Sequence, residues 1–510
     1  MDTKTRSVRV RFAPSPTGPL HIGGVRTALY NFLFARKHKG KFILRIEDTD
    51  QKRFVPGAEK YIIDALEWCG LSPDEGPSVG GGHGPYRQSE RKNMYSSFVQ
   101  QLLDSGHAYY AFDTPEELEE MRANMKASGV PSPTYNNITR SSMKNSLTLP
   151  AEETKKRIDS GEKHVIRIKM PRNEEIKFED QIRGWVSVNS NHVDDKVIFK
   201  SDGMPTYHLA NVVDDYSMKI THVIRGEEWL PSAPLHIYLY KCFGWDIDMP
   251  VFAHLPLILK PDGNGKLSKR DGDRLGFPVF PLDWHSNERS EIFSGYREQG
   301  FIEDAFINML AFLGWNPGTD QEVFSMPELI NNFSLDRVGK SGAKYDFSKT
   351  KWFNQQHLRK QTNQKIFEEI IAINDGITSQ SSKEHIMKVI ALVKERAVFY
   401  NDILEEGAVF FSDSIKFDQK AINKKWKQEF ASKLVELSNK LMDLENFKQK
   451  DIEQAFNLYL DFSGMSVGKI MPMLRIAITG RLAGPSMFEA LELIGKEKMK
   501  KRIDFAINTI

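Results

Sequence analysis

The 510-residue sequence has few cysteines, no long apolar segment and almost no excess of either charge. Its two cysteines, Cys69 and Cys242, exclude a disulfide framework and are typical of a reducing cytoplasm. No apolar run approaches the ~20 residues that a membrane-spanning helix needs, and the first expected strand lies too close to Met1 to follow a signal or transit peptide. We therefore expect a cytoplasmic protein with no membrane partner.

The charges nearly cancel, because 70 Lys and Arg residues face 68 Asp and Glu residues and leave a net charge of +2. A protein with this balance that binds a polyanion must concentrate its basic residues on part of its surface. The length predicts several domains, since a single hydrophobic core rarely grows beyond ~250–300 residues.

The usual nucleotide fingerprints, a phosphate loop with Gly-Lys-Ser/Thr and a Gly-x-Gly-x-x-Gly turn, are absent, yet residues 8–50 carry a strand–helix–strand pattern. Residues 8–12 alternate as a half-buried strand does, apolar positions between 25 and 33 form a helical stripe, and residues 41–46 predict a second strand. This pattern predicts a right-handed crossover between parallel strands, with a ligand crevice at their carboxyl ends.

The turn between the first strand and the helix suggests a site for an anion. The helix is expected to begin beside His21, where its free N–H groups and the positive end of its dipole would attract a phosphate. Gly18, Gly23 and Gly24 would let that phosphate approach the backbone. The same residues could also form nothing more than a tight turn, and by themselves they do not decide between the two interpretations.

Six motifs together resemble the class I aminoacyl-tRNA synthetases, in the form carried by bacterial glutamyl-tRNA synthetases. They occur in the family's order, and the resemblance extends from about residue 8 to the C-terminus, strongest up to residue 270. The motifs are RFAPSPTGPLHIGG at 11–24, LRIEDTD at 44–50, GPYRQS at 84–89, YHLANVVDD at 207–215, RGEEW at 225–229 and KLSKR at 266–270.

The resemblance implies a multidomain α/β protein. A Rossmann-like parallel-sheet catalytic domain is split by an α+β insertion and is followed by an all-α C-terminal anticodon-binding region. The expected parts are the first half of the catalytic domain at 1–95, a tRNA acceptor-end-binding insertion at 96–205, the second half with a lysine loop at 206–270, a stem-contact region at 271–345 and the helical anticodon-binding region at 346–510. Residues 276–300 look like an insertion that packs against the lysine loop.

The resemblance also assigns the chemistry. Attack of an amino-acid carboxylate on the α-phosphate of ATP develops negative charge on phosphoryl oxygens, so positioned donors and cations lower the barrier. His21, Lys266 and Lys269 would be these catalytic groups, and His21, Gly23, Glu228 and Lys269 would bind ATP. Mg²⁺ would accompany the triphosphate, held largely by phosphate and water, so no protein ligand to a metal is named.

Selection of the amino acid is expected to depend on charge. A glutamate side-chain carboxylate is best held by guanidinium groups, and Arg11 and Arg225 lie at the ends of expected strands that face the crevice. Glu47 could bind the α-ammonium group. Arg11 could instead be a solvent-facing strand residue. Bound glutamine would leave buried arginines without a negative partner, so the binding site itself can reject it. We therefore expect no editing domain. The resemblance adds the remaining residues of the glutamate pocket, which are Ala13, Ser15, Tyr207 and Asn211.

The C-terminal region combines apolar helical stripes with basic faces. Basic faces are mostly solvated surface, but they also suit a phosphate backbone. Arg475, within PMLRIAITG at 472–480, resembles a family position near the anticodon. The basic residues form a first group of Lys416, Lys420, Lys424, Lys425 and Lys427, and a second group of Lys496, Lys498, Lys500, Lys501 and Arg502.

Some family members bind zinc in the insertion through cysteines and a histidine. This sequence has no cysteine between Cys69 and Cys242, so a Cys-rich tetrahedral site cannot be built there. We therefore expect no zinc. We also expect a monomer whose partners are L-glutamate, ATP and tRNA-Glu.

The resemblance implies ligation of L-glutamate to tRNA-Glu, through an ATP-dependent glutamyl-adenylate and then transfer to the 3′-terminal adenosine of the tRNA. Three alternatives are a non-discriminating form that also charges tRNA-Gln, a shortened paralogue that glutamylates a modified tRNA base, and a tRNA-binding paralogue without ligation. Residues 352–510 argue against the second, and His21, Lys266 and Lys269 argue against the third. The sequence does not decide whether tRNA-Gln is charged or whether glutamate activation needs bound tRNA.

Overall fold

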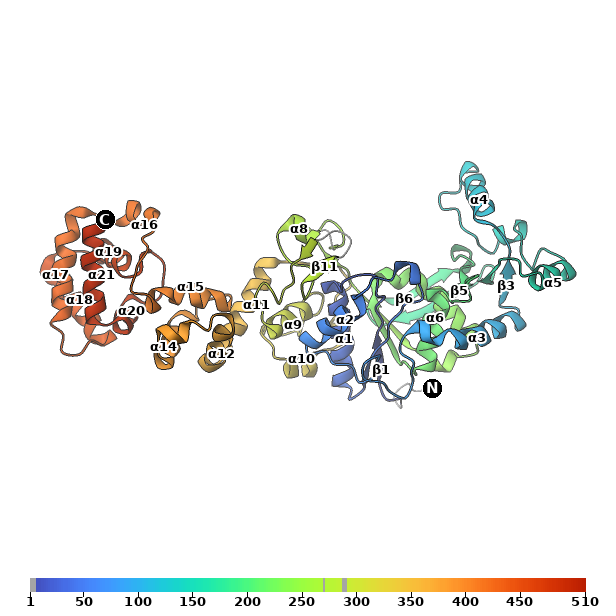
Figure 1. Ribbon diagram of the computed structural model, residues 1–510. Coiled ribbons are helices and arrows are strands. Elements are labelled where there is room, and N and C mark those ends of the chain that lie inside the picture. The colour runs from blue at the N-terminus through green and yellow to red at the C-terminus, as the bar shows by residue number, and fades with distance from the viewer. Residues whose placement is uncertain (1–5, 269–270, 287–290) are drawn as a thin grey trace. The chain divides into compact units, whose positions relative to one another are not determined.

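The computed structural model describes residues 6–268, 271–286 and 291–510 (Figure 1). The chain forms two compact units, which we call unit 1 (1–299 and 306–347) and unit 2 (300–305 and 348–510). Lys269 and Arg270, at the end of the expected lysine loop, lie outside the described residues. Within the described ranges, no helix is both long enough and apolar enough to cross a membrane.

Unit 1 is built around a six-stranded sheet with the strand order β2-β1-β8-β9-β5-β6. All neighbouring strands are parallel except β6, which runs antiparallel to β5. The predicted parallel crossover is confirmed, because the first two strands pair in parallel from Arg9↔Lys41 to Phe12↔Leu44. The strands are β1 (Arg9–Phe12), β2 (Lys41–Leu44), β5 (Glu175–Asp180), β6 (Gly184–Asn189), β8 (His222–Gly226) and β9 (Val251–Leu255).

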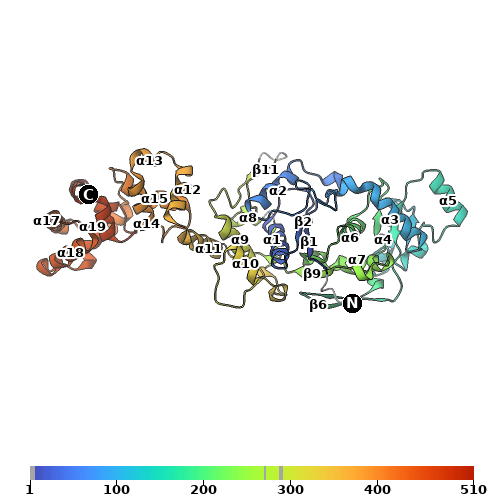
Figure 2. The same ribbon diagram turned by 90° about the horizontal axis from the view of Figure 1, so that it is seen from below.

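Helices cover both faces of this sheet (Figure 2). α1 (Ile22–Lys37) packs against β1, β2 and β8 on one face, whereas α6 (Tyr207–Ser217) and α7 (Ala233–Cys242) share a core with β5, β8 and β9 on the other. The crossover from β1 leads to β2 on one side, and the crossover from β8 leads to β9 on the other side. The β1–β8 pair is therefore the point where the strand order reverses, which is where a crevice opens at the carboxyl ends of the strands.

The part of the chain between β2 and β8 forms a second, smaller sheet in unit 1, with the order β3-β4-β7 and antiparallel pairing. The β5–β6 hairpin comes from the same part of the sequence but joins the main sheet, where β5 pairs with β9. The elements of this part are α2 (Ala58–Trp68), α3 (Lys92–Asp104), β3 (Ala108–Ala111), α4 (Pro115–Ala127), α5 (Ala151–Asp159), β4 (Val165–Ile168) and β7 (Val197–Phe199).

The chain after β9 contributes short elements, and a wholly helical region follows, as the sequence predicts. The strand β9 ends at Leu255, and a second, two-residue strand follows as β10 (Ile258–Leu259). The other short elements are α8 (Asp271–Leu275), β11 (Trp284–Ser286), β12 (Glu291–Phe293), α9 (Glu303–Ala311), α10 (Met326–Asn332) and β13 (Ala343–Lys344).

Unit 2 is helical and has one continuous apolar core, to which helices from α12 to α21 contribute buried side chains. Its buried residues recur at helical spacing, as in Ile386, Val389, Ile390 and Val393 of α14. The helices are α11 (Phe347–Lys360), α12 (Asn363–Ile373), α13 (Ile377–Gln380), α14 (Lys383–Val393), α15 (Tyr400–Phe411), α16 (Gln419–Lys425), α17 (Ala431–Met442), α18 (Gln449–Ser463), α19 (Val467–Thr479), α20 (Met487–Ile494) and α21 (Lys496–Thr509).

Candidate active site

The start of α1 lies at the carboxyl end of β1, as predicted, but its backbone does not offer open hydrogen-bond donors. The N–H of Ile22 donates to Val279 O (3.0 Å), and the N–H of Gly23 donates to His21 Nδ1 (3.1 Å). The N–H groups of Gly24 and Val25 both donate to the carbonyl of His21. The expectation that free N–H groups here would bind a phosphate is therefore wrong, because His21 and a distant segment already satisfy them.

The two glycines beside His21 differ in their surroundings. A Cβ added at Gly24 would lie 2.5 Å from Leu20 Cδ1, so a larger residue there would displace the Leu20 side chain, and Gly24 also lines a cavity. A Cβ at Gly23 would meet nothing closer than His21 Nδ1 at 3.4 Å, and Gly23 lines a cavity. Since His21 Nδ1 accepts a hydrogen bond from Gly23, the proton of the neutral imidazole is carried by Nε2.

The segment that closes the helix start comes from residues 277–283, which we call the capping segment. Besides the bond from Ile22 to Val279 O, the ring of Phe280 contacts His21 edge-on with centroids 6.4 Å apart. The Tyr61 hydroxyl donates to Leu282 O at 2.6 Å, which fixes the segment to α2. The sequence indicated only packing against the lysine loop for this stretch, and the structure gives it contacts with His21 and α2.

Buried ion pairs bring three of the sequence motifs together on the other side of the crevice. Asp215 of α6 accepts hydrogen bonds from Arg11 Nε (3.0 Å) and Arg45 Nη1 (2.7 Å), and Arg45 Nη2 donates to Glu47 (2.9 Å). Burial alone would raise the pKa of Asp215, but the two guanidinium groups hold it below its ordinary value. Burial raises the pKa of Glu47 despite Arg45. Arg11 is therefore a buried residue and not a solvent-facing one.

Arg225 of β8 is equally buried, but its partners are neutral. Its Nε donates to His254 Nε2 (3.0 Å), its Nη1 lies 3.1 Å from the Tyr207 hydroxyl and 3.3 Å from His236 Nδ1, and its Nη2 lies 3.4 Å from Trp229 O. Within the described part of the chain, no carboxylate pairs with this guanidinium. Burial lowers its pKa below the ordinary value. The arrangement leaves a positive charge without a protein counter-ion in the crevice.

These residues line one cavity of about 250 Å³ at the β1–β8 switch point. The wall includes all seven residues predicted to bind glutamate and two of those predicted to bind ATP, Gly23 and Glu228. The aromatic ring of Trp229 lies over Tyr207 with centroids 4.3 Å apart and closes one side. The seven residues are Arg11, Ala13, Ser15, Glu47, Tyr207, Asn211 and Arg225.

Of the predicted catalytic lysines, only Lys266 can be placed. It lies on the strand-like stretch next to β10 and its Nζ donates to Glu228 Oε1 at 2.9 Å, with about half of its side chain exposed. Lys269 lies outside the described residues. Lys266 is thus joined to the rim of the cavity through Glu228, a residue predicted for the ATP side.

Two histidines and an aspartate in contact around Arg225, which are His236, His254 and Asp180, were not predicted from the sequence. His254 stands in the apolar strand β9 and His236 in the apolar helix α7, and single histidines in such segments carry no pattern of their own. Asp180 lies in the hairpin that was assigned to the insertion. Only pairing between β8 and β9, which sets Arg225 beside His254, brings them together.

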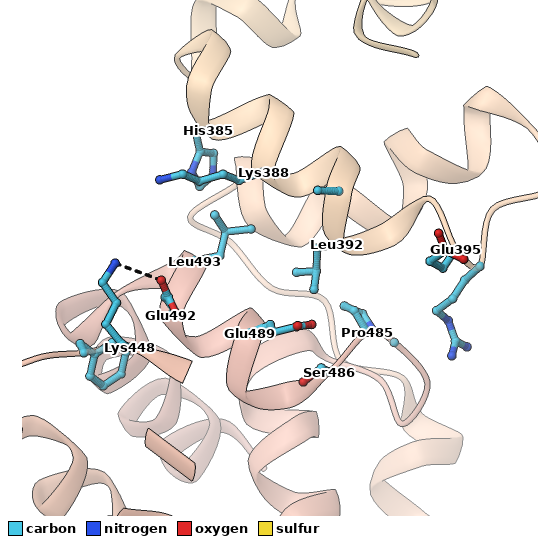
Figure 3. Close-up of a pocket in the computed structure, with 14 residues that line it drawn as sticks. His385, Lys388, Leu392, Glu395, Lys448, Pro485, Ser486, Glu489, Glu492 and Leu493 are labelled. Atoms are coloured by element: carbon cyan, nitrogen blue, oxygen red, sulfur yellow. Dashed lines mark hydrogen bonds and ion pairs between the residues drawn. The ribbon is translucent and has the colours of Figure 1, made fainter. Parts of the chain in front are cut away.

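Unit 2 has a cavity of about 730 Å³ between α14 and α20, across which side chains of the two helices face each other (Figure 3). His385 and Lys388 of α14 and Arg396 line it, together with Pro485. Arg475 lies behind this wall, where its Nη1 donates to Pro485 O at 2.8 Å. Burial, and then the charge of Arg396, lower the pKa of Arg475.

The two basic groups of unit 2 differ. The five lysines of the first group are exposed, and none forms an ion pair with another described residue. In the second group, Arg502 is buried and donates to three backbone carbonyls, while Lys498 and Lys500 pair with Asp413 and Asp504. The second group is therefore not the open basic face that the sequence suggested.

Comparison with known proteins agrees with this geometry. Residues 7–352 match the family described as tRNA synthetases class I (E and Q), catalytic domain, and residues 356–507 match the anticodon binding domain family. The glutamate–tRNA ligase of Cytophaga hutchinsonii is 53% identical over 511 residues, covering 100% of this chain and 99% of the relative. That of Amoebophilus asiaticus is also 53% identical and covers 99% of both chains.

Two solved structures of high similarity have the same fold. A glutamate tRNA ligase from Elizabethkingia meningosepticum, crystallised in complex with its amino acid, is 51% identical with a TM-score of 0.91, covering 99% of this chain and 100% of its own. The glutamate–tRNA synthetase of Elizabethkingia anophelis is 50% identical with a TM-score of 0.89 and the same coverage. This chain therefore belongs to the class I aminoacyl-tRNA synthetases of the glutamate and glutamine group, with a Rossmann-like catalytic domain followed by a helical anticodon-binding domain.

Proposed function

We propose that the chain ligates L-glutamate to tRNA-Glu in two steps, formation of glutamyl-adenylate from ATP and transfer of the glutamyl group to the 3′-terminal adenosine of the tRNA. The observation that carries this proposal is the buried Arg225 guanidinium, which lines the cavity at the switch point and has only neutral partners among the described residues. A buried charge of this kind is stabilised by an anionic ligand.

The other buried charges of the pocket balance one another. Arg11 and Arg45 are compensated by Asp215 and Glu47, so Arg225 is the arginine of the cavity wall that has no carboxylate partner in the described part of the chain. The γ-carboxylate of glutamate supplies the missing negative charge. Glu47, whose side chain also accepts a hydrogen bond from Asn211 at 3.3 Å, binds the α-ammonium group. The α-carboxylate is then directed towards ATP.

The same balance disfavours glutamine. Its amide has nearly the shape of the carboxylate but no charge, so Arg225 would stay uncompensated in a buried site. Discrimination by a polar group of this kind can reach ~10⁴–10⁵ without an editing site. Ala13, Ser15 and Tyr207 complete the wall around the side chain.

In the first step, an oxygen of the α-carboxylate attacks the α-phosphorus of ATP and diphosphate leaves. His21 donates through Nε2 to the phosphoryl oxygens on which charge develops, and Lys266 and Lys269 add positive charge there. Each such donor is typically worth ~10²–10³ in rate. Gly23 and Glu228 contact the nucleotide, and Mg²⁺ arrives with the triphosphate. In the second step, the 2′-hydroxyl of the terminal adenosine attacks the mixed anhydride and AMP leaves.

The tRNA is contacted by several parts of the chain. Residues 96–205 bind the acceptor end, residues 271–345 contact the stem and residues 346–510 bind the anticodon. The match of residues 356–507 to an anticodon-binding domain supports this arrangement and speaks against the shortened paralogue that modifies a tRNA base. Arg475, through its bond to Pro485 O, supports the wall of the unit 2 cavity where an anticodon base is read.

The insertion is proposed to be held together without zinc. Its core contains the carboxylate of Asp195, which accepts hydrogen bonds from the Tyr109 hydroxyl (2.7 Å), Arg140 Nη1 (3.0 Å) and Met170 N (3.1 Å). Metal analysis of the purified protein is expected to find less than one zinc per ten chains, and chelation by 1,10-phenanthroline is expected to leave its thermal unfolding unchanged. One tightly held zinc per chain would contradict the proposal. We further propose a cytoplasmic monomer.

The test of the function is aminoacylation with labelled amino acid. Glutamate, glutamine and aspartate are offered separately with purified tRNA-Glu and tRNA-Gln at low and high salt. Of the three amino acids, we expect only glutamate to be attached, and we expect it to be attached to tRNA-Glu. Charging of tRNA-Gln with glutamate identifies the non-discriminating form of the same activity. Absence of glutamate charging on both tRNAs under all conditions would refute the proposal.

A further inference from the structure

Two histidines contact the guanidinium that recognises the γ-carboxylate, and a third contacts one of these two. Strand pairing sets Arg225 of β8 directly opposite His254 of β9, so the two side chains lie on the same face of the sheet. The Arg225 Nε–H donates to His254 Nε2 at 3.0 Å, while Nη1 lies 3.3 Å from His236 Nδ1. His208 Nδ1 lies 3.2 Å from His236 Nε2 and continues the chain of rings.

Asp180 determines which nitrogen of His254 carries the proton. Its Oδ2 lies 2.6 Å from His254 Nδ1, and both side chains are fully buried. A carboxylate accepts, so Nδ1 bears the hydrogen and Nε2 keeps a lone pair. Asp180 is itself fixed, because its Oδ1 accepts the backbone N–H groups of Ile182 (3.0 Å) and Arg183 (2.9 Å). A single tautomer of His254 thus presents an acceptor to Arg225.

The charged and titratable groups around His254 favour its neutral form. From the neighbouring elements these are Asp180 of β5, Arg183 of the β5–β6 turn, Arg225 of β8 and His236 of α7. Burial lowers the pKa of His254, and the arginines lower it further, against the opposing effect of Asp180. A protonated ring would direct an N–H at the Nε–H of Arg225, and that contact would be repulsive.

The geometry distinguishes a positioning role from a purely structural one. If the Asp180–His254 pair only joined the β5–β6 hairpin to the sheet, the second nitrogen of the ring would have no defined task. Instead it accepts the Nε–H of the Arg225 guanidinium at 3.0 Å. This bond restricts rotation of a guanidinium that lines the cavity and whose Nη1 contacts Tyr207, another residue of the cavity wall.

We propose that Asp180 and His254 form a positioning pair, in which Asp180 fixes the tautomer of His254 and His254 orients Arg225 for the side-chain carboxylate of the amino acid. This inference rests on the proposed function, because it assigns the orientation of the residue that reads the substrate. A guanidinium that turns about its Cδ–Nε bond loses the planar fit to a carboxylate, and this fit is the basis of its selectivity.

Two substitutions of His254 separate the contact with Arg225 from the contact with Asp180. In His254→Gln the side-chain amide reaches the place of Nε2 and its oxygen can accept from Arg225. In His254→Asn the amide reaches only the place of Nδ1, next to Asp180. The matched control is His222→Asn on β8, where the ring packs on Phe34 and has no contact with Arg225.

We measure steady-state aminoacylation of tRNA-Glu by the full-length chain. His254→Asn is expected to raise the KM for glutamate by about 10- to 100-fold, because a hydrogen bond to a charged group is lost, and to leave the KM for ATP within threefold of wild type. His254→Gln is expected to recover most of the loss, with a KM within about fivefold of wild type. His222→Asn is expected to match the wild type.

Several outcomes would overturn the inference. These are an unchanged KM for glutamate in His254→Asn, equal damage in the Gln and Asn variants, or a parallel rise in the KM for ATP. If wild type itself charges no glutamate, the proposed function fails instead. Should the Asn variant not fold, ¹⁵N-histidine NMR of the wild type decides: His254 protonated at Nδ1 alone supports the inference, and a charged ring or the Nε2-protonated tautomer refutes it.

Discussion

At the scale of single residues, the two arginines of the crevice have different electrostatic tasks. Arg11 is already neutralised by Asp215, so it can offer a ligand a hydrogen bond but little net charge. Arg225 has no carboxylate partner among the described residues and is held by His254, Tyr207 and His236. An unpaired buried charge destabilises a protein by several kcal/mol unless a ligand compensates it. If the proposed function holds, this difference makes Arg225 the residue that we expect to select for a negative charge.

This difference predicts the effect of Arg225→Lys. An ammonium group keeps the charge but loses the planar, two-pronged contact and the bond to His254, so the KM for glutamate should rise about 100-fold, equivalent to roughly 3 kcal/mol. The KM for ATP should change less than threefold. Arg9→Lys is the matched control, because Arg9 lies on β1 and pairs with Glu75 away from the cavity. Equal KM values for glutamate in both variants would contradict the assignment.

His208 provides a prediction for pH. Burial lowers its pKa to about 4, below the ordinary value near 6.5. Between pH 4 and pH 6.5, His208 binds a proton in the unfolded chain but not in the folded chain. The contribution of neutral His208 to the free energy of unfolding is therefore fully present above pH 6.5 and is lost as the pH falls towards 4. Allowing for partial exposure, the stability advantage of wild type over His208→Gln should shrink by about 1–2 kcal/mol from pH 7.5 to pH 5.0.

Urea unfolding at the two pH values, followed by tryptophan fluorescence, measures this difference. His222→Gln provides a second case in the same assay. Burial also lowers the pKa of His222 to about 4, so the stability difference between wild type and this variant should depend on pH in the same way. A wild-type and a His208→Gln curve that shift in parallel between the two pH values would show that His208 titrates normally in the folded state.

At the scale of elements, local pattern and long-range contact contribute differently. The crossover from β1 through α1 to β2 follows from periodicity in adjacent residues, so the sequence predicted it. The sequence did not predict that the N–H groups at the start of α1 are already hydrogen-bonded. The acceptor for Ile22 N is Val279 O, which is far away along the chain. The motif residues around the proposed glutamate pocket were predicted through family resemblance. The pair Asp180–His254 was not, because it exists only through strand register.

The capping segment is predicted to act on catalysis through His21. Phe280→Leu keeps an apolar side chain but removes the ring that contacts the imidazole. A donor used only in the transition state then loses its position, so kcat should fall about tenfold while the KM for glutamate stays within threefold. Phe324→Leu is the control, since Phe324 is buried in unit 1 against Trp315 and not against His21. A fall in kcat of the same size in the control would indicate general loosening instead.

At the scale of the whole molecule, a net charge of +2 conceals an uneven surface. Most residues of the second basic group of unit 2 have partners within the protein. Arg502 donates to backbone carbonyls, and Lys498 and Lys500 form ion pairs with Asp413 and Asp504. The first group around α16 remains exposed and has no acidic partner among the described residues. We therefore expect the phosphate backbone of tRNA to be attracted to α16, although the chain as a whole is nearly neutral.

Two double variants with the same change in net charge test this location. Lys424→Gln with Lys425→Gln removes two exposed charges of α16, and Lys498→Gln with Lys500→Gln removes two paired charges of α21. The first is expected to raise the KM for tRNA-Glu about three- to tenfold at 150 mM salt and to reduce the slope of log KM against log salt by about 1–2, as one phosphate contact accounts for roughly one unit. The second should change the KM by less than twofold and leave the slope as in wild type, and the KM for glutamate should be constant in both. Equal effects of the two double variants would mean that total charge, and not the α16 surface, attracts the tRNA.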